Sequence, residues 1–214
     1  VDLGSTTIAA HLCNLRTGEV IHSTGVMNPQ IRFGEDLMSR VSFSMMNKDG
    51  TDKLKTVVRE ALNELCNQII KDCKIDKKQL VEITLVCNPV MHHLLLGINP
   101  TELGQAPFAL ATSDSLYVNS LELDLTFLGN TKVYILPCIA GHVGADAAAV
   151  ILSEEPNESK ENVLIIDVGT NAELILGNKN KVLTCSSPTG PAFEGAQISS
   201  GQRAAPGAIE NVRI

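Results

Sequence analysis

The chain has 214 residues, of which 44% are hydrophobic and 19% charged, so it is long and apolar enough to bury a sizeable core. Its net charge of −7 and its 3% aromatic content argue against a nucleic-acid partner, because phosphate backbones attract clustered lysines and arginines. The longest apolar region, residues 134–152, is interrupted by Pro137, Gly141, His142, Gly144 and Asp146, so no membrane span is expected. Residue 1 already lies in a strand-like pattern, which indicates no signal peptide and a soluble, cytoplasmic protein.

The first part of the chain is predicted to form three strands and two helices. The strands cover residues 1–3, 7–15 and 19–27, and the helices cover residues 33–46 and the segment after Gly50-Thr51-Asp52. The second helix is the clearest element, because its apolar residues repeat at the helical period along one stripe. The stripe consists of Leu54, Val57, Val58, Ala61, Leu62, Leu65, Cys66, Ile69 and Ile70.

The middle of the chain alternates between strands, helices and one long loop. The predicted elements are a strand over residues 81–87, a helix over 90–96, a loop over 99–119, a strand over 133–137 and a helix over 141–153. The most polar stretch, residues 153–161, is interpreted as the boundary between two lobes, residues 1–155 and 160–214.

The last part repeats the topology of the first. Strands are predicted over residues 163–167, 172–176 and 181–185, and a short glycine-rich helical segment over 189–209. The order strand, Asp-x-Gly, strand, turn, strand therefore occurs twice. The second copy is cut short and the chain lacks an initiator Met, so we expect an incomplete second lobe and a native protein that extends upstream.

Six cysteines are present, and none belongs to a Cys-x-x-Cys motif. A zinc ribbon and an iron–sulfur ligand run are therefore not indicated. Most of the cysteines lie within or beside apolar segments, which predicts reduced thiols in the core.

The two Asp-x-Gly copies form what we call the first turn, residues 2–6, and the second turn, residues 167–171. A glycine after a strand lets backbone N–H groups approach an anion, and nearby hydroxyls add donors. The candidate phosphate contacts are Gly4, Ser5, Thr6, Gly169, Thr170 and Asn171. Asp2 and Asp167 are candidate Mg²⁺ ligands through water, because a bare carboxylate would repel phosphate. We predict that the turns face each other across a phosphate-binding cleft, although Asp and Gly are also ordinary turn residues.

Two other nucleotide-binding patterns are missing from the sequence. No Gly-x-x-x-x-Gly-Lys-Ser/Thr motif exists, and no Gly-x-Gly-x-x-Gly follows a strand. A P-loop protein and a dinucleotide-binding fold are therefore not supported.

Several segments resemble known families. "VDLGSTT", "LIIDVGTNAEL" and "GHVGADAAAVIL" resemble the first phosphate motif, the second phosphate motif and the first connecting helix of the ASKHA superfamily of kinases, chaperones and actin. Together with "MNPQIRFGEDLMSRV", "MHHLLLG", "YILPCIAGHVGAD" and "GPAFEGAQISSGQRAAPGAI", they resemble the ATP-dependent reductive activators of corrinoid proteins. This resemblance covers nearly the whole chain, and the final segment is its most specific part.

The resemblance implies an α/β fold with actin-like, ribonuclease-H-like lobes, each a mixed sheet flanked by helices. It also implies ATP and Mg²⁺ as cofactors and a corrinoid protein as partner. An inactive Co(II) corrinoid would receive one electron from a [2Fe–2S] ferredoxin-like domain. The chain departs from that family by lacking the ferredoxin cysteines, by ending before an adenosine-binding segment, and by carrying Cys87-Asn88-Pro89 in place of a Gly-Asn-Thr turn.

Two carboxylates are the candidate catalytic residues. The resemblance to sugar kinases implies that Asp146 is a catalytic base or orients water, with Asp2 acting beside it through the metal. The alternative for Asp146 is a first-turn aspartate favoured by the helix dipole. Glu173 is a further candidate for the magnesium shell, or else strand alternation turns it outward.

Several further positions are candidates for functional or structural roles. His92 and His93 are adjacent on a helix and cannot easily share a metal, so one buried and one exposed histidine are expected. Glu194 either lines the cleft or caps a helix, Arg203 contacts phosphate or lies in solvent, and the amide of Gly190 is a candidate nucleotide contact. Lys53, Lys55 and Arg59 are predicted to form a solvated helix face.

Rival functions remain open at this point. A small-molecule kinase of the same fold would use Asp146 as its base, and a nucleotide-gated binding module would show no turnover. The oligomeric state is also open, with a homodimer as one option.

Overall fold

A computed structural model describes residues 1–126, 131–169, 171–188 and 212–213 of the chain. The chain divides into two compact units, Val1–Glu154 and Glu155–Ile214. The division lies within the polar stretch of residues 153–161.

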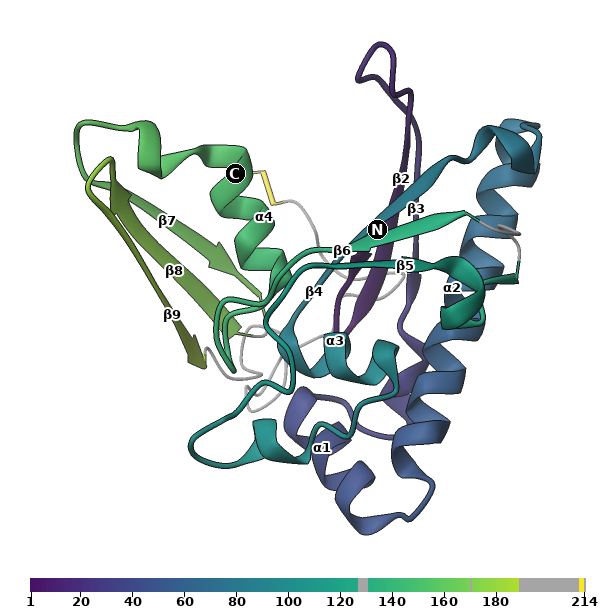
Figure 1. Cartoon of the computed structure of the whole chain (residues 1–214), viewed down its shortest axis with the longest axis horizontal. Coiled ribbons are helices and arrows are strands. Elements are labelled where there is room, and N and C mark those ends of the chain that lie inside the picture. Colours follow the sequence, from purple (N-terminus) through teal and green to yellow (C-terminus); the bar gives the residue numbers. More distant parts are fainter. Residues whose placement is uncertain (127–130, 170, 189–211, 214) are drawn as a thin grey trace. The chain divides into compact units, whose positions relative to one another are not determined.

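The first unit contains a six-stranded mixed sheet of order β3-β2-β1-β4-β6-β5 (Figure 1). Its strands are β1 (Asp2–Leu3), β2 (Thr7–Cys13), β3 (Val20–Met27), β4 (Glu82–Cys87), β5 (Leu116–Asn119) and β6 (Lys132–Ile135). β1, β2 and β3 are antiparallel neighbours, whereas β1, β4 and β6 run parallel to one another. The predicted loop over residues 99–119 was wrong at its end, because β5 pairs antiparallel with β6. A four-residue strand is too short to show a clear period in the sequence.

Four helices accompany this sheet: α1 (Leu37–Met46), α2 (Gly50–Cys73), α3 (Pro89–Leu96) and α4 (Ala145–Glu154). α1 begins later than predicted, because η1 (Pro29–Arg32) is a 3-10 turn and the Asp36 carboxylate caps α1 by accepting from the Ser39 N–H at 2.7 Å. α4 also begins later than predicted, since Ala140 and Val143 pair in a β-bridge. In the described part of the chain, no helix is long and apolar enough to cross a bilayer.

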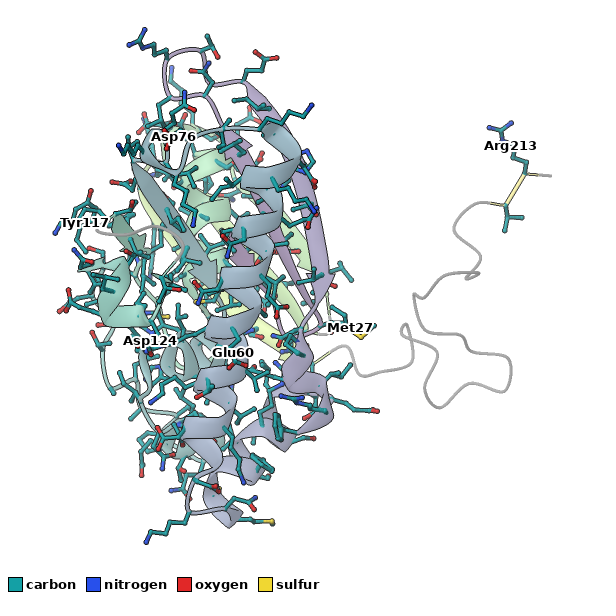
Figure 2. All side chains as sticks on the ribbon, turned by 90° about the vertical axis from the view of Figure 1, so that its right-hand side faces the viewer. Met27, Glu60, Asp76, Tyr117, Asp124 and Arg213 are labelled. Atoms are coloured by element: carbon teal, nitrogen blue, oxygen red, sulfur yellow. The ribbon has the colours of Figure 1, made fainter. Side chains whose placement is uncertain are left out.

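The helices cover both faces of the sheet. One face and α2 share the main core, in which Leu3, Ile8 and Leu85 pack with the buried stripe of α2. The neighbouring strand residues Val86 and Tyr134 point to the other face, where they pack with Ala145 of α4. The predicted α2 stripe is confirmed, since all its members are buried except the half-buried Ile70. Figure 2 shows the opposite side of α2, where Glu60 is exposed.

Short 3-10 segments connect several of these elements. Besides η1, they are η2 (Lys77–Gln79), η3 (Thr101–Gly104), η4 (Ser120–Leu123) and, in the second unit, η6 (Pro156–Glu158).

The second unit contains an antiparallel sheet of β7 (Val163–Val168), β8 (Asn171–Asn178) and β9 (Lys181–Pro188). Its strand order and its Asp-x-Gly turn after the first strand match β1, β2 and β3, so the predicted repeat of topology is confirmed. Ile175 of β8 is fully buried. The helical segment predicted over residues 189–209 lies outside the described residues.

All six cysteines are free thiols, as predicted. Cys66, Cys87 and Cys138 are buried, whereas Cys13 and Cys185 are exposed. Burial raises the pKa of the Cys66 thiol to about 12 and that of the Cys138 thiol to about 11. These buried thiols are therefore protonated core residues.

Candidate functional site

The first turn connects β1 to β2, and other parts of the protein donate hydrogen bonds to three of its carbonyl groups, those of Gly4, Ser5 and Thr6. The Asn28 side chain donates from Nδ2 to the Gly4 carbonyl at 2.8 Å, and the Asn28 N–H donates to the Thr6 carbonyl at 2.8 Å. The carbonyl between them, that of Ser5, accepts from the Arg40 guanidinium. Asn28 and Arg40 are both fully buried, so the body of the unit fixes the conformation of this turn.

Gly4 is required by close contact. A Cβ atom at this position would lie 2.5 Å from the Thr7 carbonyl oxygen, which is far inside van der Waals contact. The backbone of the turn therefore folds closely upon itself.

Asp2 and Asp146 lie on the same side of the sheet. Asp2 is in register with Val86, whose side chain packs on the face that carries α4, and Asp146 is in the first turn of α4. Burial is the main reason that the pKa of the Cys87 thiol is raised, and the negative charges of Asp146 and Asp2 both raise it further. The two candidate catalytic carboxylates thus both lie near the C-terminal end of β4, a central strand of the sheet.

The Cys87-Asn88-Pro89 turn has a clear structural role. The Asn88 side chain accepts from the Met91 N–H at 2.9 Å and so caps α3. Gly144 packs tightly on this turn, since a Cβ atom there would lie 2.5 Å from the Cys87 carbonyl oxygen. The turn after β4 therefore supports the loop that leads into α4 and Asp146, whose carboxylate accepts from the Ala147 N–H at 2.8 Å.

The second turn connects β7 to β8. The Gly169 N–H donates to the Asn171 carbonyl at 2.8 Å, so one of its amides is bonded within the turn. Asp167 is directly opposite Glu173 in the β7–β8 register, which places the two side chains on one face. Burial raises the pKa of Glu173, the charge of Asp167 raises it further, and the Ser186 hydroxyl, which donates at 3.1 Å, opposes the shift. Two adjacent carboxylates form a local negative charge that a divalent cation would relieve.

The described residues contain no group of three or more His, Cys, Asp or Glu that could hold a metal ion. Mg²⁺ keeps several of its waters and is commonly held by one or two carboxylates together with phosphate oxygens. Asp2 and Asp167, the predicted ligands, are both exposed. Thr170, Gly190, Glu194 and Arg203 lie outside the described residues. The prediction that the two turns face each other stays a prediction.

The expectation for the two histidines was wrong, because both are buried. His93 accepts from the Ala111 N–H at 3.0 Å, and its Nδ1 donates to the Pro89 carbonyl at 2.9 Å. Neither ring nitrogen of His92 has a partner within the described residues, and burial lowers the pKa of His92 to about 4. His93 therefore connects the loop before β5 to α3 through hydrogen bonds. His92 is a neutral core residue.

Sequence reasoning also misjudged two arginines. Arg59 was expected on a solvated face, yet it is buried, donates to the Leu95 carbonyl at 2.9 and 2.7 Å and pairs with Asp124 at 2.6 Å. Asp124 lies beside α2 in Figure 2. Arg40 lies within the helix predicted over residues 33–46, and its contact with the first turn was not predicted. The available signal was the segment "NPQIRFGEDLMSR" itself, which supplies Asn28, Gln30 and Arg40 together.

Comparison with known protein families identifies the chain. The family model described as the RACo middle region matches residues 1–159. The chain belongs to the RACo family. A second model, described as the C-terminal domain of RACo, the ASKHA domain, matches residues 161–214. The mixed sheet flanked by helices agrees with the actin-like fold that this second match implies.

Individual RACo-like proteins match along nearly the whole chain. The corrinoid activation enzyme RamQ of Eubacterium limosum is 34% identical over 211 residues, which cover 99% of this chain and 35% of that protein. A [Co(II) methylated amine-specific corrinoid protein] reductase of Methanosarcina barkeri is 28% identical over 225 residues, covering 100% of this chain and 40% of that protein.

A solved structure of a reductive activator for corrinoid, iron–sulfur protein has a TM-score of 0.87 to this chain at 36% identity. The match covers 95% of this chain and 32% of that one. The chain thus spans about a third of the length of the RACo relatives that it matches.

Proposed function

We propose that this chain is the ATP-binding part of a protein that reduces an inactive Co(II) corrinoid protein to Co(I). The observation that carries the proposal is the similarity of nearly the whole chain to proteins named for corrinoid activation or reduction. The electron would come from a [2Fe–2S] domain outside this chain, so that one electron lost by the cluster reduces one cobalt. The partner would accordingly be a corrinoid protein.

In this proposal the two turns bind the phosphates of Mg-ATP. Backbone and hydroxyl donors of Gly4, Ser5, Thr6, Gly169, Thr170 and Asn171 contact phosphate, with a further amide at Gly190. Asp2 and Asp167 hold Mg²⁺ through water. The close fold of the first turn around Gly4 and the paired carboxylates of Asp167 and Glu173 support this assignment. Residues 1–155 and 160–214 would then be the parts of two ribonuclease-H-like lobes.

Asp146 is the proposed residue that orients the attacking water. It lies near the same end of β4 as Asp2, and an ATPase needs such a group. The Asp146→Asn variant should lower the rate of ATP hydrolysis by about 100-fold while the Kd for Mg-ATP stays within about threefold. The exposed Asp114→Asn variant is the matched control and should leave both unchanged. Equal loss of hydrolysis in both variants would remove Asp146 from this role.

The proposal is tested by calorimetric titration of Mg-ATP into the native polypeptide that contains this chain. Asp2→Ala and Asp167→Ala should each weaken binding by at least about tenfold, since each removes a ligand of the metal. Asp114→Ala is again the control. Unchanged affinity in both variants would overturn the two-turn site. Nucleotide-dependent capture of a corrinoid protein without phosphate release would instead favour a binding module, and phosphate transfer to a small molecule would favour a kinase.

A further inference from the structure

Arg40 is a buried cation that contacts three separate segments of the first unit. Its guanidinium donates to the Ser5 carbonyl in the first turn, to the Gly34 carbonyl at 3.1 Å and to the Gln30 side-chain oxygen at 3.1 Å. A fourth contact, at 3.1 Å, is made to the sulfur of Met91. The side chain has no solvent exposure. Its three oxygen partners are neutral, and no carboxylate of the described residues lies within ion-pair distance of it.

An unpaired charge in a protein interior is costly, so it calls for a compensating feature. Burial lowers the pKa of Arg40 to about 10, and the charge of Asp36 opposes this shift, so the guanidinium keeps its proton at neutral pH. The positive charge therefore stays directly behind the peptide between Ser5 and Thr6. An anion bound in front of that peptide would supply the missing opposite charge.

The hydrogen bonds to the turn also fix the direction of its N–H groups. In a planar trans peptide the C=O and the following N–H point in opposite directions. The Gly4 carbonyl points to the Asn28 side chain and the Ser5 carbonyl points to Arg40. The N–H groups of Ser5 and Thr6 must therefore point away from the interior. Two adjacent N–H groups on the outer side of a turn form a concave site for an anion.

We propose that Arg40 is the positioning residue of the phosphate-binding turn, which it holds by the Ser5 carbonyl so that the Ser5 and Thr6 N–H groups meet the phosphate. Its charge acts on the same phosphate through the intervening peptide. The inference rests on the proposed function, because it assumes that the first turn binds a nucleotide phosphate.

Gln30 connects this arrangement to the core. It is fully buried, donates from Nε2 to the Leu54 carbonyl of α2 at 2.8 Å and accepts from Arg40. A series of hydrogen bonds thus connects α2 to the first turn. The Leu54 carbonyl of α2 accepts from Gln30, Gln30 accepts from Arg40, and Arg40 donates to the Ser5 carbonyl. This path consists of hydrogen bonds between groups that have little room to move.

The test compares two buried arginines in the native polypeptide that contains this chain. Arg40→Lys keeps the charge but cannot reproduce the planar set of donors, and Arg59→Lys is the matched control because Arg59 contacts Leu95 and Asp124 rather than the turn. Titrations of Mg-ATP and of adenosine, which lacks phosphate, are compared by calorimetry. Arg40→Lys should weaken Mg-ATP binding by at least about tenfold and leave adenosine binding within about twofold. Arg59→Lys should leave both within about twofold.

The outcomes separate the inference from the proposed function. Equal effects of the two lysine variants, or equal loss of Mg-ATP and adenosine binding by Arg40→Lys, would overturn the positioning role and leave the nucleotide site standing. Absence of Mg-ATP binding by the unaltered protein would overturn the proposed function together with the inference. If Arg40→Lys does not fold, Gln30→Met removes the link between Arg40 and α2 at similar volume. It should weaken Mg-ATP binding by about threefold with adenosine unchanged, and no change in this variant would contradict the inference.

Discussion

The first and second turns carry the same Asp-x-Gly pattern, yet the protein supports them in different ways. In the first turn, buried Asn28 and Arg40 bind three consecutive carbonyl groups. In the second turn, Asp167 and Gly169 are exposed, and the Gly169 N–H is bonded within the turn itself. The comparison teaches that a shared motif specifies a turn but not the contacts that the rest of the protein makes to it. We interpret the first turn as preorganised by these buried donors.

The two glycines show the same contrast. A Cβ atom at Gly4 would lie 2.5 Å from the Thr7 carbonyl oxygen, whereas at Gly169 the nearest atom would be the Asn171 carbonyl oxygen at 3.4 Å. Among the described residues, the first turn is folded so closely at Gly4 that it excludes a side chain, and no contact that close is seen at Gly169. In the first turn, the position that requires glycine is therefore also the one where buried side chains bind the backbone.

The largest expected effect concerns the support of the first turn. Arg40→Met leaves the Ser5 and Gly34 carbonyls and the Gln30 amide oxygen without their donor, which should lower the free energy of unfolding by about 3–5 kcal/mol. Ser186→Ala removes the hydroxyl that donates to Glu173 beside the second turn, and should cost no more than about 1 kcal/mol. Urea unfolding followed by circular dichroism measures both. Similar losses in the two variants would contradict the difference in support.

A smaller effect is expected at the glycines. Gly4→Ala must move the first turn, so we expect a loss of about 1–3 kcal/mol in the free energy of unfolding. Gly169→Ala meets only an ordinary contact and should change that free energy by less than about 0.5 kcal/mol. Thermal unfolding of the two variants at one protein concentration makes the comparison. A loss at Gly169 as large as that at Gly4 would show that the second turn is also closely constrained.

The smallest effect is the pH dependence of the second turn. The pKa of Glu173 is raised in the folded chain above its ordinary value of 4.5, so the folded chain binds this proton more tightly. Stability therefore falls as pH rises from 4.5 through the folded pKa, and Glu173→Gln removes that loss. Since the side chain is half-exposed, the variant should be more stable than the parent near neutral pH by less than about 1 kcal/mol.

The difference should disappear at about pH 4, where the carboxyl is protonated in both states. Thermal unfolding at the two pH values measures it, and an equal gain at both would attribute the effect to packing rather than to charge. Ser186 can still donate to the amide oxygen of Gln at this position, so the variant keeps the hydrogen bond.

Local signals in the sequence predicted much of the fold. The apolar stripe of α2 and the two sets of hairpin strands are specified by residues that lie only a few positions apart in the sequence. The structure confirms both predictions. The roles of Arg40 and Arg59 could not be predicted in this way, because their partners Ser5 and Asp124 lie 35 and 65 residues away. The sequence around a charged helical residue does not show whether that residue is buried and hydrogen-bonded to a distant carbonyl group. The burial of both His92 and His93 escaped prediction for the same reason.

The sequence likewise indicated only some residues of the candidate site. The motif after each first strand made Asp2 and Asp167 candidates, the resemblance to sugar kinases made Asp146 one, and their roles stay predictions. Register alone decided that Glu173 shares a face with Asp167, since the sequence pattern allowed either face. The residues that hold the first turn became visible only in three dimensions.

The contact between Arg40 and the first turn has an evolutionary consequence, because it is made to main-chain oxygen. Ser5 and Gly34 offer Arg40 only their carbonyl groups, which every amino acid possesses. Substitutions at position 5 can therefore accumulate without a compensating change at position 40. The side chains that meet Arg40 are those of Gln30 and Met91, so across related sequences position 40 should co-vary with these two and not with the turn that it holds.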